Sequence, residues 1–203
     1  MEIMMFQLGA YQTNCYVLCD ETQKICAVID PGDSGEALGA KIVELGYDVK
    51  AILLTHGHHD HTGGVEALHK AFPEAPIYLH PKDGREATTA MRSIVPELSV
   101  ETVDYSEGDT VTVEPFAFAV LETPGHTPGS VVLQCGELLF TGDTLFAGSC
   151  GRTDFPGSNH KDMMASLARL YPLDGQVLSG HMGQSTMERE RQSNPYLRQA
   201  MKG

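Results

Sequence analysis

The sequence has no tryptophan, few basic residues and no long apolar run. Its 203 residues contain 14 Lys and Arg against 27 Asp and Glu, which gives a formal net charge of −13. That charge would repel a phosphate backbone, so we expect no nucleic-acid partner. No apolar stretch approaches the roughly 20 residues that a membrane-spanning helix needs, and the first residues lack the pattern of a secretory signal. We therefore expect a cytoplasmic protein with no membrane partner.

Cysteine is also scarce, with five residues scattered along the chain. An odd number of cysteines in a chain of this length does not indicate a disulfide framework, so we expect reduced, mostly buried thiols. Cys15 and Cys19 share one face of an expected strand. Two thiols alone are weak evidence for a metal site.

The remaining composition is that of an ordinary globular chain, with 41% hydrophobic and 20% charged residues. We expect a single domain over residues 1–203, because this length suits one domain. Helical patterns cover residues 35–45, 65–72 and 161–170, and a further helix interrupted near Pro195 is expected within residues 186–198. Residues 87–106 predict a helix followed by a long loop over a cleft. Strands are expected at residues 16–18, 25–29, 50–54, 77–80, 110–113, 116–121, 131–134, 138–140 and 176–178.

Nine histidines are a high count for this chain, and several of them cluster. The run of residues 55–64 contains His56, His58, His59, Asp60 and His61, directly after an expected strand and directly before an expected helix. Loops at the carboxyl ends of strands commonly carry binding sites in α/β proteins. Crowded imidazoles become favourable when their neutral nitrogens share a divalent cation. The run therefore predicts a metal site.

Three later turns repeat this arrangement of a ligand-type residue beside glycine after an expected strand. They present His126, Asp143 and His181, one in each turn. A single His or Asp beside glycine is more typical of an ordinary turn. Together with the first run, however, the three turns predict one shared metal centre.

The succession His-x-His-x-Asp-His, then His, Asp and His in glycine turns, resembles the metallo-β-lactamase superfamily over nearly the whole chain. This resemblance implies an α/β fold, a four-layer αββα sandwich of two mixed β-sheets flanked by helices, with a dinuclear site at one edge. It implies two ligand groups, namely His56, His58 and His126 for one metal, and Asp60, His61 and His181 for the other, with Asp143 bridging. His59 falls at a non-ligand position.

Imidazole and carboxylate ligands without thiolates suit zinc, iron or manganese at a catalytic site. We expect two divalent metal ions, zinc in the first place. A hydroxide bridging two such ions is a nucleophile near neutral pH and would attack a carbonyl carbon. Asp60 and Asp143 are the expected catalytic carboxylates, and Asp60 would orient the hydroxide or take up a proton.

The run Ser-Cys-Gly-Arg-Thr-Asp-Phe-Pro-Gly at residues 149–157 resembles the glyoxalase II-like branch, in its short single-domain hydroxyacylglutathione hydrolase form. This implies a thioesterase acting on 2-hydroxyacyl-glutathione thioesters such as S-lactoylglutathione. Arg152 is then a candidate substrate-binding residue that holds a carboxylate. An ion pair between Arg152 and Asp154 is the alternative role. Asp30 is either an acceptor for a ligand histidine or part of a plain turn.

Other functions remain open from the sequence. A persulfide dioxygenase-like protein would bind one iron through residues that match His56, His126 and Asp143, and would be an oxidoreductase. A non-enzymatic binding module is a third class. Lactam hydrolysis is disfavoured, because β-lactamases of the superfamily typically lack the bridging carboxylate that Asp143 resembles. The sequence leaves the oligomeric state open.

Overall fold

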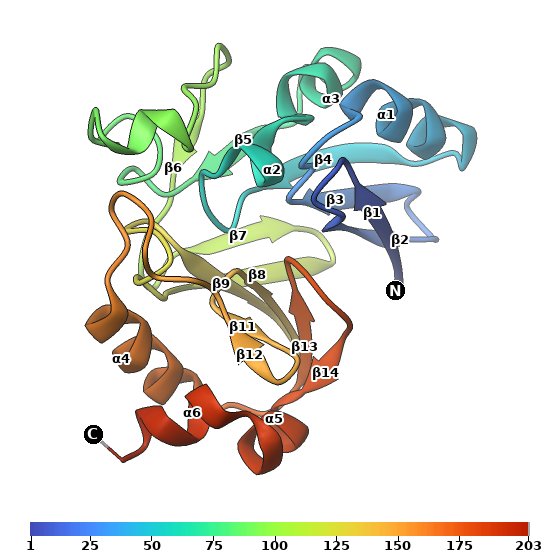
Figure 1. Ribbon diagram of the computed structural model, residues 1–203. Helices are drawn as coiled ribbons and strands as arrows, with labels where there is room; N and C mark the ends of the chain where they lie inside the picture. Colours follow the sequence, from blue (N-terminus) through green and yellow to red (C-terminus); the bar gives the residue numbers. More distant parts are fainter. Residues whose placement is uncertain (203) are drawn as a thin grey trace.

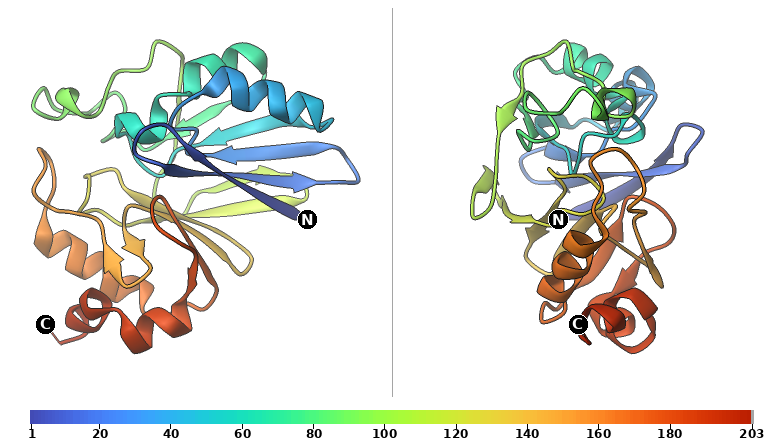
Figure 2. Two further views of the ribbon diagram at one scale, coloured as in Figure 1. Left: turned by 45° about the vertical axis from the view of Figure 1, so that its right-hand side comes forward. Right: turned by 60° about the vertical axis from the view of Figure 1, so that its left-hand side comes forward.

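Two six-stranded sheets pack face to face, with helices on both outer surfaces (Figures 1 and 2). The computed structural model describes residues 1–202. The first half of the chain forms one sheet and its helices, and the second half forms the other (Figure 1). This four-layer arrangement confirms the predicted fold class.

The first sheet follows chain order. Its strands are β1 (Glu2–Leu8), β2 (Thr13–Asp20), β3 (Ile25–Ile29), β4 (Asp48–Leu53), β5 (Ile77–Leu79) and β6 (Val103–Asp104). Strands β1 to β3 are antiparallel neighbours, whereas β3 to β6 run parallel. The parallel part needs crossover connections, and these contain α1 (Gly35–Glu44), α2 (His59–Thr62), α3 (Val65–Ala71) and the one-turn helix η1 (Met91–Ser93).

The second sheet has the order β14-β13-β10-β9-β8-β7. Its strands are β7 (Thr110–Val113), β8 (Phe116–Glu122), β9 (Val131–Cys135), β10 (Leu138–Gly142), β13 (Gln176–Ser179) and β14 (Ser185–Thr186). Strands β10 and β13 are parallel and are connected through α4 (His160–Leu170), preceded by the small hairpin of β11 (Leu145–Phe146) and β12 (Ser149–Cys150). The C-terminal helices α5 (Met187–Ser193) and α6 (Pro195–Ala200) follow.

The core between the sheets contains a line of aromatic side chains. Tyr16 and Phe140 lie 5.5 Å apart between ring centres, and Phe118 and Phe140 lie 6.2 Å apart. All three are buried, and they join residues of both sheets in one hydrophobic cluster. Aromatic pairs at such distances add to the stabilisation from burial alone.

Two further clusters attach the helices. Leu38, Ile42 and Leu68 pack α1 and α3 on the first sheet, while Met163 and Leu197 pack α4 and α6 on the second. The layers are visible in Figure 2. Four of the five cysteines are buried and Cys150 is half-buried, which agrees with the expectation that most of the thiols are buried. Within residues 1–202, no helix combines the length and apolarity needed to cross a bilayer.

The helices expected near residues 35–45, 65–72 and 161–170 are present with small shifts at their ends. The Asn159 side chain caps α4 by accepting hydrogen bonds from two backbone N–H groups. The expected break in the C-terminal helix lies at Asn194, whose side chain caps α6.

The helix expected within residues 87–106 is wrong apart from the single turn η1. Pro96 disfavours helical geometry at the residue before it, and polar residues follow. The loop over a cleft is correct, since Ile94 lines the main cavity. Strand β1 was not predicted, because its methionines and glutamine lack a β-branched pattern; its pairing with β2 places it.

We expect Phe118→Ala to lower the free energy of unfolding by about 3–5 kcal/mol, because it leaves a cavity between the two sheets. Urea unfolding followed by circular dichroism measures the change. Val43→Ala is the control, since Val43 lies on the outer side of α1 and is 60% exposed; its effect should stay within about 0.5 kcal/mol. A loss below 1 kcal/mol for Phe118→Ala would show that this position does not hold the sheets together.

Candidate metal centre

The predicted ligands lie where strands of both sheets end. His56 follows β4, and α2 then carries Asp60 and His61. His126, Asp143 and His181 follow β8, β10 and β13 of the second sheet. All seven predicted residues meet in overlapping groups whose ligand-type atoms lie within 4.8 Å of one another: His56, His58 and His126; His56, His61 and Asp143; Asp60, His61 and His181.

The first group consists of three imidazoles. His58 Nδ1 lies 3.1 Å from Nε2 of His56 and 2.9 Å from Nε2 of His126. All three rings are buried. Burial, assisted by the neighbouring histidines, lowers the pKa of His56 and brings the pKa of His58 to about 3. These two rings are therefore neutral at pH 7, as metal ligation requires.

The second group adds a carboxylate. Asp60 Oδ2 lies 3.3 Å from His181 Nε2 and 3.8 Å from His61 Nε2. Asp143 lies between the two groups, with Oδ1 3.3 Å from His61 Nε2 and Oδ2 3.4 Å from His126 Nε2. Its position between them fits the predicted bridging role.

The two groups differ in charge. Burial alone would lower the pKa of His61, but Asp143 and Asp30 outweigh it and raise that pKa. Burial likewise opposes the charged form of Asp143, yet His61 and its neighbours bring the pKa of Asp143 to about 2. The pKa of Asp60 lies below its ordinary value, because hydrogen bonding and charge from His181 and His61 exceed the effect of burial. The carboxylates beside the second group are therefore ionised and favour positive charge next to them.

Three polar atoms of this centre are buried without a hydrogen-bond partner in the part of the chain that the structure describes. They are His58 Nε2, His61 Nε2 and Asp143 Oδ1, and the last two face each other at 3.3 Å. Buried polar atoms are nearly always satisfied, and imidazole nitrogens with carboxylate oxygens are ligands for divalent transition metals. The donor set therefore fits a binuclear metal site.

Asp30 orients one ligand directly. Its Oδ2 accepts from His61 Nδ1 at 3.0 Å, so that His61 Nε2 points into the centre. Both oxygens also accept from Thr55, through its backbone N–H and its hydroxyl at 2.7 Å each. Asp30 thus accepts from one of the candidate ligand histidines, as one of the two sequence expectations had it. Such outer contacts fix ring orientation at metal sites.

Asp83 performs a related task that the sequence analysis missed. Its buried carboxylate accepts from Gly57 N–H at 2.9 Å, from Thr127 Oγ1 at 2.6 Å and from Gly129 N–H at 2.8 Å. Burial raises the pKa of Asp83 although these hydrogen bonds oppose the rise. Asp83 thereby joins the loop of His56 and His58 to that of His126. The available signal was an acid in a proline-containing turn after an expected strand.

The turn before His181 is held from the first sheet. Asn14 Nδ2 and the Tyr16 hydroxyl both donate to the carbonyl of Ser179, at 3.0 and 2.8 Å. Gly180 is required here, because a Cβ at this position would overlap Asp143 and His61. Neither Asn14 nor Tyr16 was expected to support the site from sequence.

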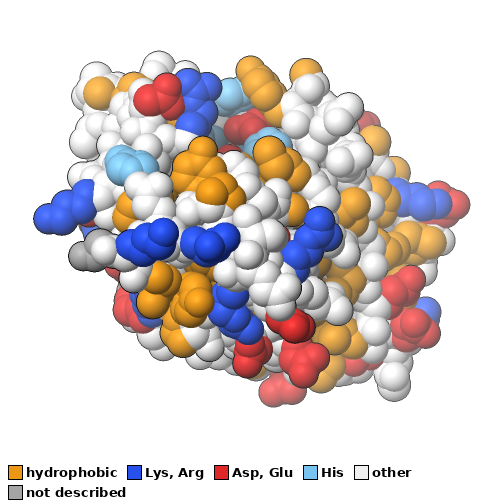
Figure 3. All heavy atoms as spheres, turned by 60° about the horizontal axis from the view of Figure 1, so that its bottom comes forward, with side chains coloured by type: hydrophobic (Ala, Val, Ile, Leu, Met, Phe, Trp, Pro, Cys, Tyr) orange, Lys and Arg blue, Asp and Glu red, His pale blue; other side chains and the backbone are white. Residues whose placement is uncertain are grey.

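The centre lies at the floor of a cavity of about 540 Å³. Tyr11, Phe146, Phe155 and Met182 give this cavity apolar walls. Figure 3 shows a hollow in which histidine and acidic side chains lie among hydrophobic ones. His59 lies at the cavity as an exposed residue and contacts the Tyr11 ring edge-on at 5.4 Å, in keeping with its expected non-ligand position.

Arg152 lines the same cavity, but its guanidinium already has a partner. It makes two hydrogen bonds of 2.7 Å to Asp154 and lies over the Phe155 ring at 4.1 Å. Both charged side chains are more than half exposed. The ion pair considered from the sequence is therefore present. The Arg152 backbone carbonyl also accepts from His126 Nδ1 at 2.8 Å, independently of the side chain.

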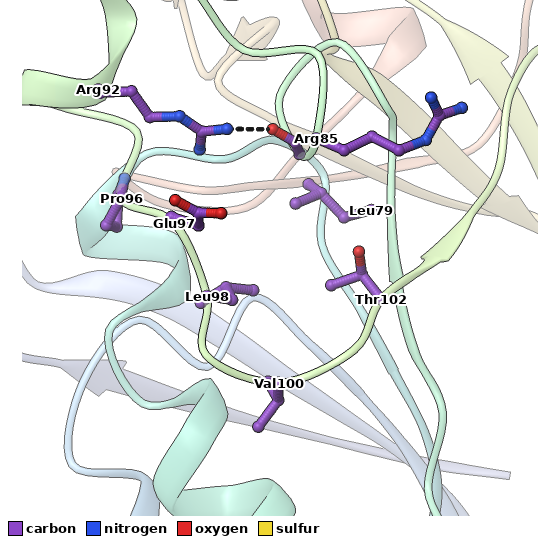
Figure 4. A pocket seen from close by; sticks show the side chains of 9 residues that line it. Leu79, Arg85, Arg92, Pro96, Glu97, Leu98, Val100 and Thr102 are labelled. Atoms are coloured by element: carbon purple, nitrogen blue, oxygen red, sulfur yellow. Dashed lines mark hydrogen bonds between the residues drawn. The ribbon is translucent and has the colours of Figure 1, made fainter. Parts of the chain in front are cut away.

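A second, smaller hollow of about 110 Å³ lies beside residues 96–102 (Figure 4). Arg92 donates to the Gly84 carbonyl at 2.7 Å there. This hydrogen bond ties the segment near Ile94 to the turn at Gly84. None of its lining residues belongs to the metal-type groups found in residues 1–202.

The other three histidines lie outside the centre. His80 pairs with Glu122 at 2.9 Å, His69 contacts the Ala75 carbonyl, and His160 is exposed.

A sequence profile of the metallo-beta-lactamase superfamily matches residues 8–181. The chain belongs to the metallo-β-lactamase superfamily. Within this superfamily it is 34% identical to the hydroxyacylglutathione hydrolase GloC of Haemophilus influenzae, over 97% of this chain and 98% of that protein.

Two solved structures are also similar to it. The BLEG-1 B3 metallo-β-lactamase superposes with a TM-score of 0.87 at 34% identity, covering 97% of this chain and 99% of the other. TTHA1623 in a di-iron-bound form superposes with a TM-score of 0.81 at 36% identity, covering 95% and 99%. The fold, the donor set and these relatives together support a metallo-hydrolase.

We expect Asp143→Ala to lower the metal content and abolish activity, because the substitution removes the carboxylate between the two groups. Elemental analysis of the purified protein gives the number of metal ions per chain. Asp109→Ala is the control, since Asp109 is an exposed acid far from the centre in sequence. Unchanged metal content with full activity in Asp143→Ala would contradict the bridging role.

Proposed function

We propose that this protein is a metal-dependent thioesterase that hydrolyses 2-hydroxyacyl-glutathione-like thioesters of the S-lactoylglutathione type. The observation that carries the proposal is the pair of ligand groups facing each other across Asp143 at the floor of an open cavity. The full-length likeness to a hydroxyacylglutathione hydrolase supports this substrate class.

Each group of residues has a defined task in this reaction. His56, His58 and His126 would hold one divalent cation, and Asp60, His61 and His181 the other, with Asp143 between them. When bound, such a pair supplies Lewis-acid polarisation of a carbonyl and activation of water near neutral pH. Zinc, iron and manganese all suit these ligands; zinc is our first assignment.

Asp60 and Asp143 both line the cavity, and Asp60 is the more exposed of the two. Its side chain is 16% exposed against 9% for Asp143, and its Oδ2 also accepts from the Thr13 hydroxyl at 3.4 Å. Its low pKa keeps it ionised at pH 7. Asp60 is therefore placed to accept a hydrogen bond from the attacking water and to orient it toward the thioester carbon.

Lactam hydrolysis is the second candidate function. The sequence argument against it, the presence of Asp143, is weakened by the likeness to the BLEG-1 B3 metallo-β-lactamase over nearly the full length of both chains. Attack of water on a carbonyl is common to both reactions. The two reactions differ in the substrate that must fit the cavity, a glutathione thioester or a lactam.

Metal analysis combined with three assays tests the proposal. The protein is purified without metal supplementation and assayed for S-lactoylglutathione hydrolysis, nitrocefin hydrolysis and oxygen uptake with glutathione persulfide. Near two metal ions per chain with thioester turnover, lost on chelation and restored by added metal, supports the thioesterase. Nitrocefin turnover without thioester turnover favours the second candidate, and one iron per chain with oxygen uptake overturns both.

We expect Arg152→Ala to raise the KM for glutathione thioesters roughly fivefold, equivalent to about 1 kcal/mol for an exposed charged contact. The KM for simple thioesters without remote carboxylates should change little. Asp154→Asn is the matched variant, because it frees the guanidinium without removing it, and its KM for glutathione thioesters should not rise. Equal effects of Arg152→Ala on both substrates would exclude Arg152 as a carboxylate-binding residue.

A further inference from the structure

One wall of the cavity is a very small element. Phe146, Ser149 and Cys150 line the cavity and all belong to the β11–β12 hairpin. The hairpin consists of only two residue pairs, Leu145 with Cys150 and Phe146 with Ser149. Two-stranded hairpins are marginal even at greater length. Its position must therefore be fixed by other parts of the chain.

Asn194, between α5 and α6, holds both strands of the hairpin. Its Nδ2 donates to the carbonyl of Phe146 at 3.2 Å and to that of Ser149 at 2.9 Å. Its Oδ1 accepts from the first backbone N–H groups of α6. The side chain is fully buried. One amide thus joins the hairpin to the start of the last helix.

Glu190 of α5 holds the turn of the same hairpin. Its Oε2 accepts from the Gly148 N–H at 2.7 Å and from Asn194 Nδ2 at 2.8 Å, and its Oε1 accepts from the Ser185 hydroxyl. Glu190 is 1% exposed, and these donors are all neutral. A carboxylate is costly to bury without several hydrogen bonds. Figure 1 shows the hairpin next to the C-terminal helices α5 and α6.

We propose that Glu190 and Asn194 are positioning residues that fix the β11–β12 hairpin as a wall of the substrate cavity. The inference rests on the proposed function for the identity of the substrate. Neither residue lines the cavity. Both act through the hairpin backbone, which places Phe146 and Cys150 beside the metal centre. Substrate fit therefore depends on the C-terminal helices.

Cys150 reports the hairpin position without any enzymatic assay. It is half-buried at the cavity, whereas the other four cysteines are buried. The rate at which the metal-loaded protein reacts with Ellman's reagent therefore measures access to this thiol, and loss of the reaction in Cys150→Ser identifies it. In Glu190→Gln the amide nitrogen cannot accept from the donors that Glu190 now satisfies, so the hairpin should open more often.

We expect Glu190→Gln to speed labelling of Cys150 about tenfold and to raise the KM for S-lactoylglutathione more than it lowers kcat. Glu188→Gln is the matched control, because it makes the same chemical change at an exposed position of α5, and it should alter neither value. Asn194→Ser is the second variant. Serine preserves the helix cap but cannot reach both hairpin carbonyls, so it should give the same two effects. Thermal unfolding confirms that each variant is folded.

The outcomes separate this inference from the proposed function. Labelling at the wild-type rate in both folded variants overturns the inference, whatever the protein hydrolyses. Faster labelling with an unchanged KM overturns the role in substrate binding. If the unaltered protein hydrolyses no thioester but both variants label faster, the proposed function fails while the support of the hairpin by Glu190 and Asn194 stands.

Discussion

The candidate metal centre depends on keeping Asp143 between two groups of ligand-type side chains. A carboxylate that is 9% exposed is stable only beside positive charge or strong donors. Its oxygens face His61 on one side and His126 on the other, at 3.3 and 3.4 Å. Asp30 and Asp83 then use their own buried carboxylates to hold the loops of these rings. Three acids that would be costly to bury singly thus form one supported arrangement around a cation site.

The sandwich provides this arrangement because strands of both sheets end at the same edge. The first sheet provides His56 and His61, and the second provides His126, Asp143 and His181. A shift of one residue in the register of β4 or β10 would turn the following residues away from the centre. The aromatic contact between Tyr16 of the first sheet and Phe140 of the second joins the two sheets. The Tyr16 hydroxyl also holds the turn before His181, so packing between the sheets and the geometry of the centre are linked.

The gathering of the candidate ligand residues could be predicted, because chemistry that needs clustered imidazoles leaves a local pattern, as in residues 55–64. Asp30 could be named as a possible acceptor because it ends a strand beside that run. Asn14, Asp83 and Glu190 could not be predicted as supporting residues. Each has a hydrogen-bond partner far away in the sequence, at separations of 168, 26 and 42 residues, and only tertiary folding brings these partners together. The short strands β11 and β12 have no signal of their own either. Their pairing depends on contacts with Glu190 and Asn194, which lie 42 to 48 residues further along the chain.

The order of the ligands along the chain has a consequence for biosynthesis. His56, His58, Asp60 and His61 leave the ribosome well before His126 and Asp143, and His181 emerges after almost the whole second sheet. During synthesis, the nascent first half presents an incomplete set of imidazoles. The seven side chains can therefore meet only after the second sheet has folded against the first.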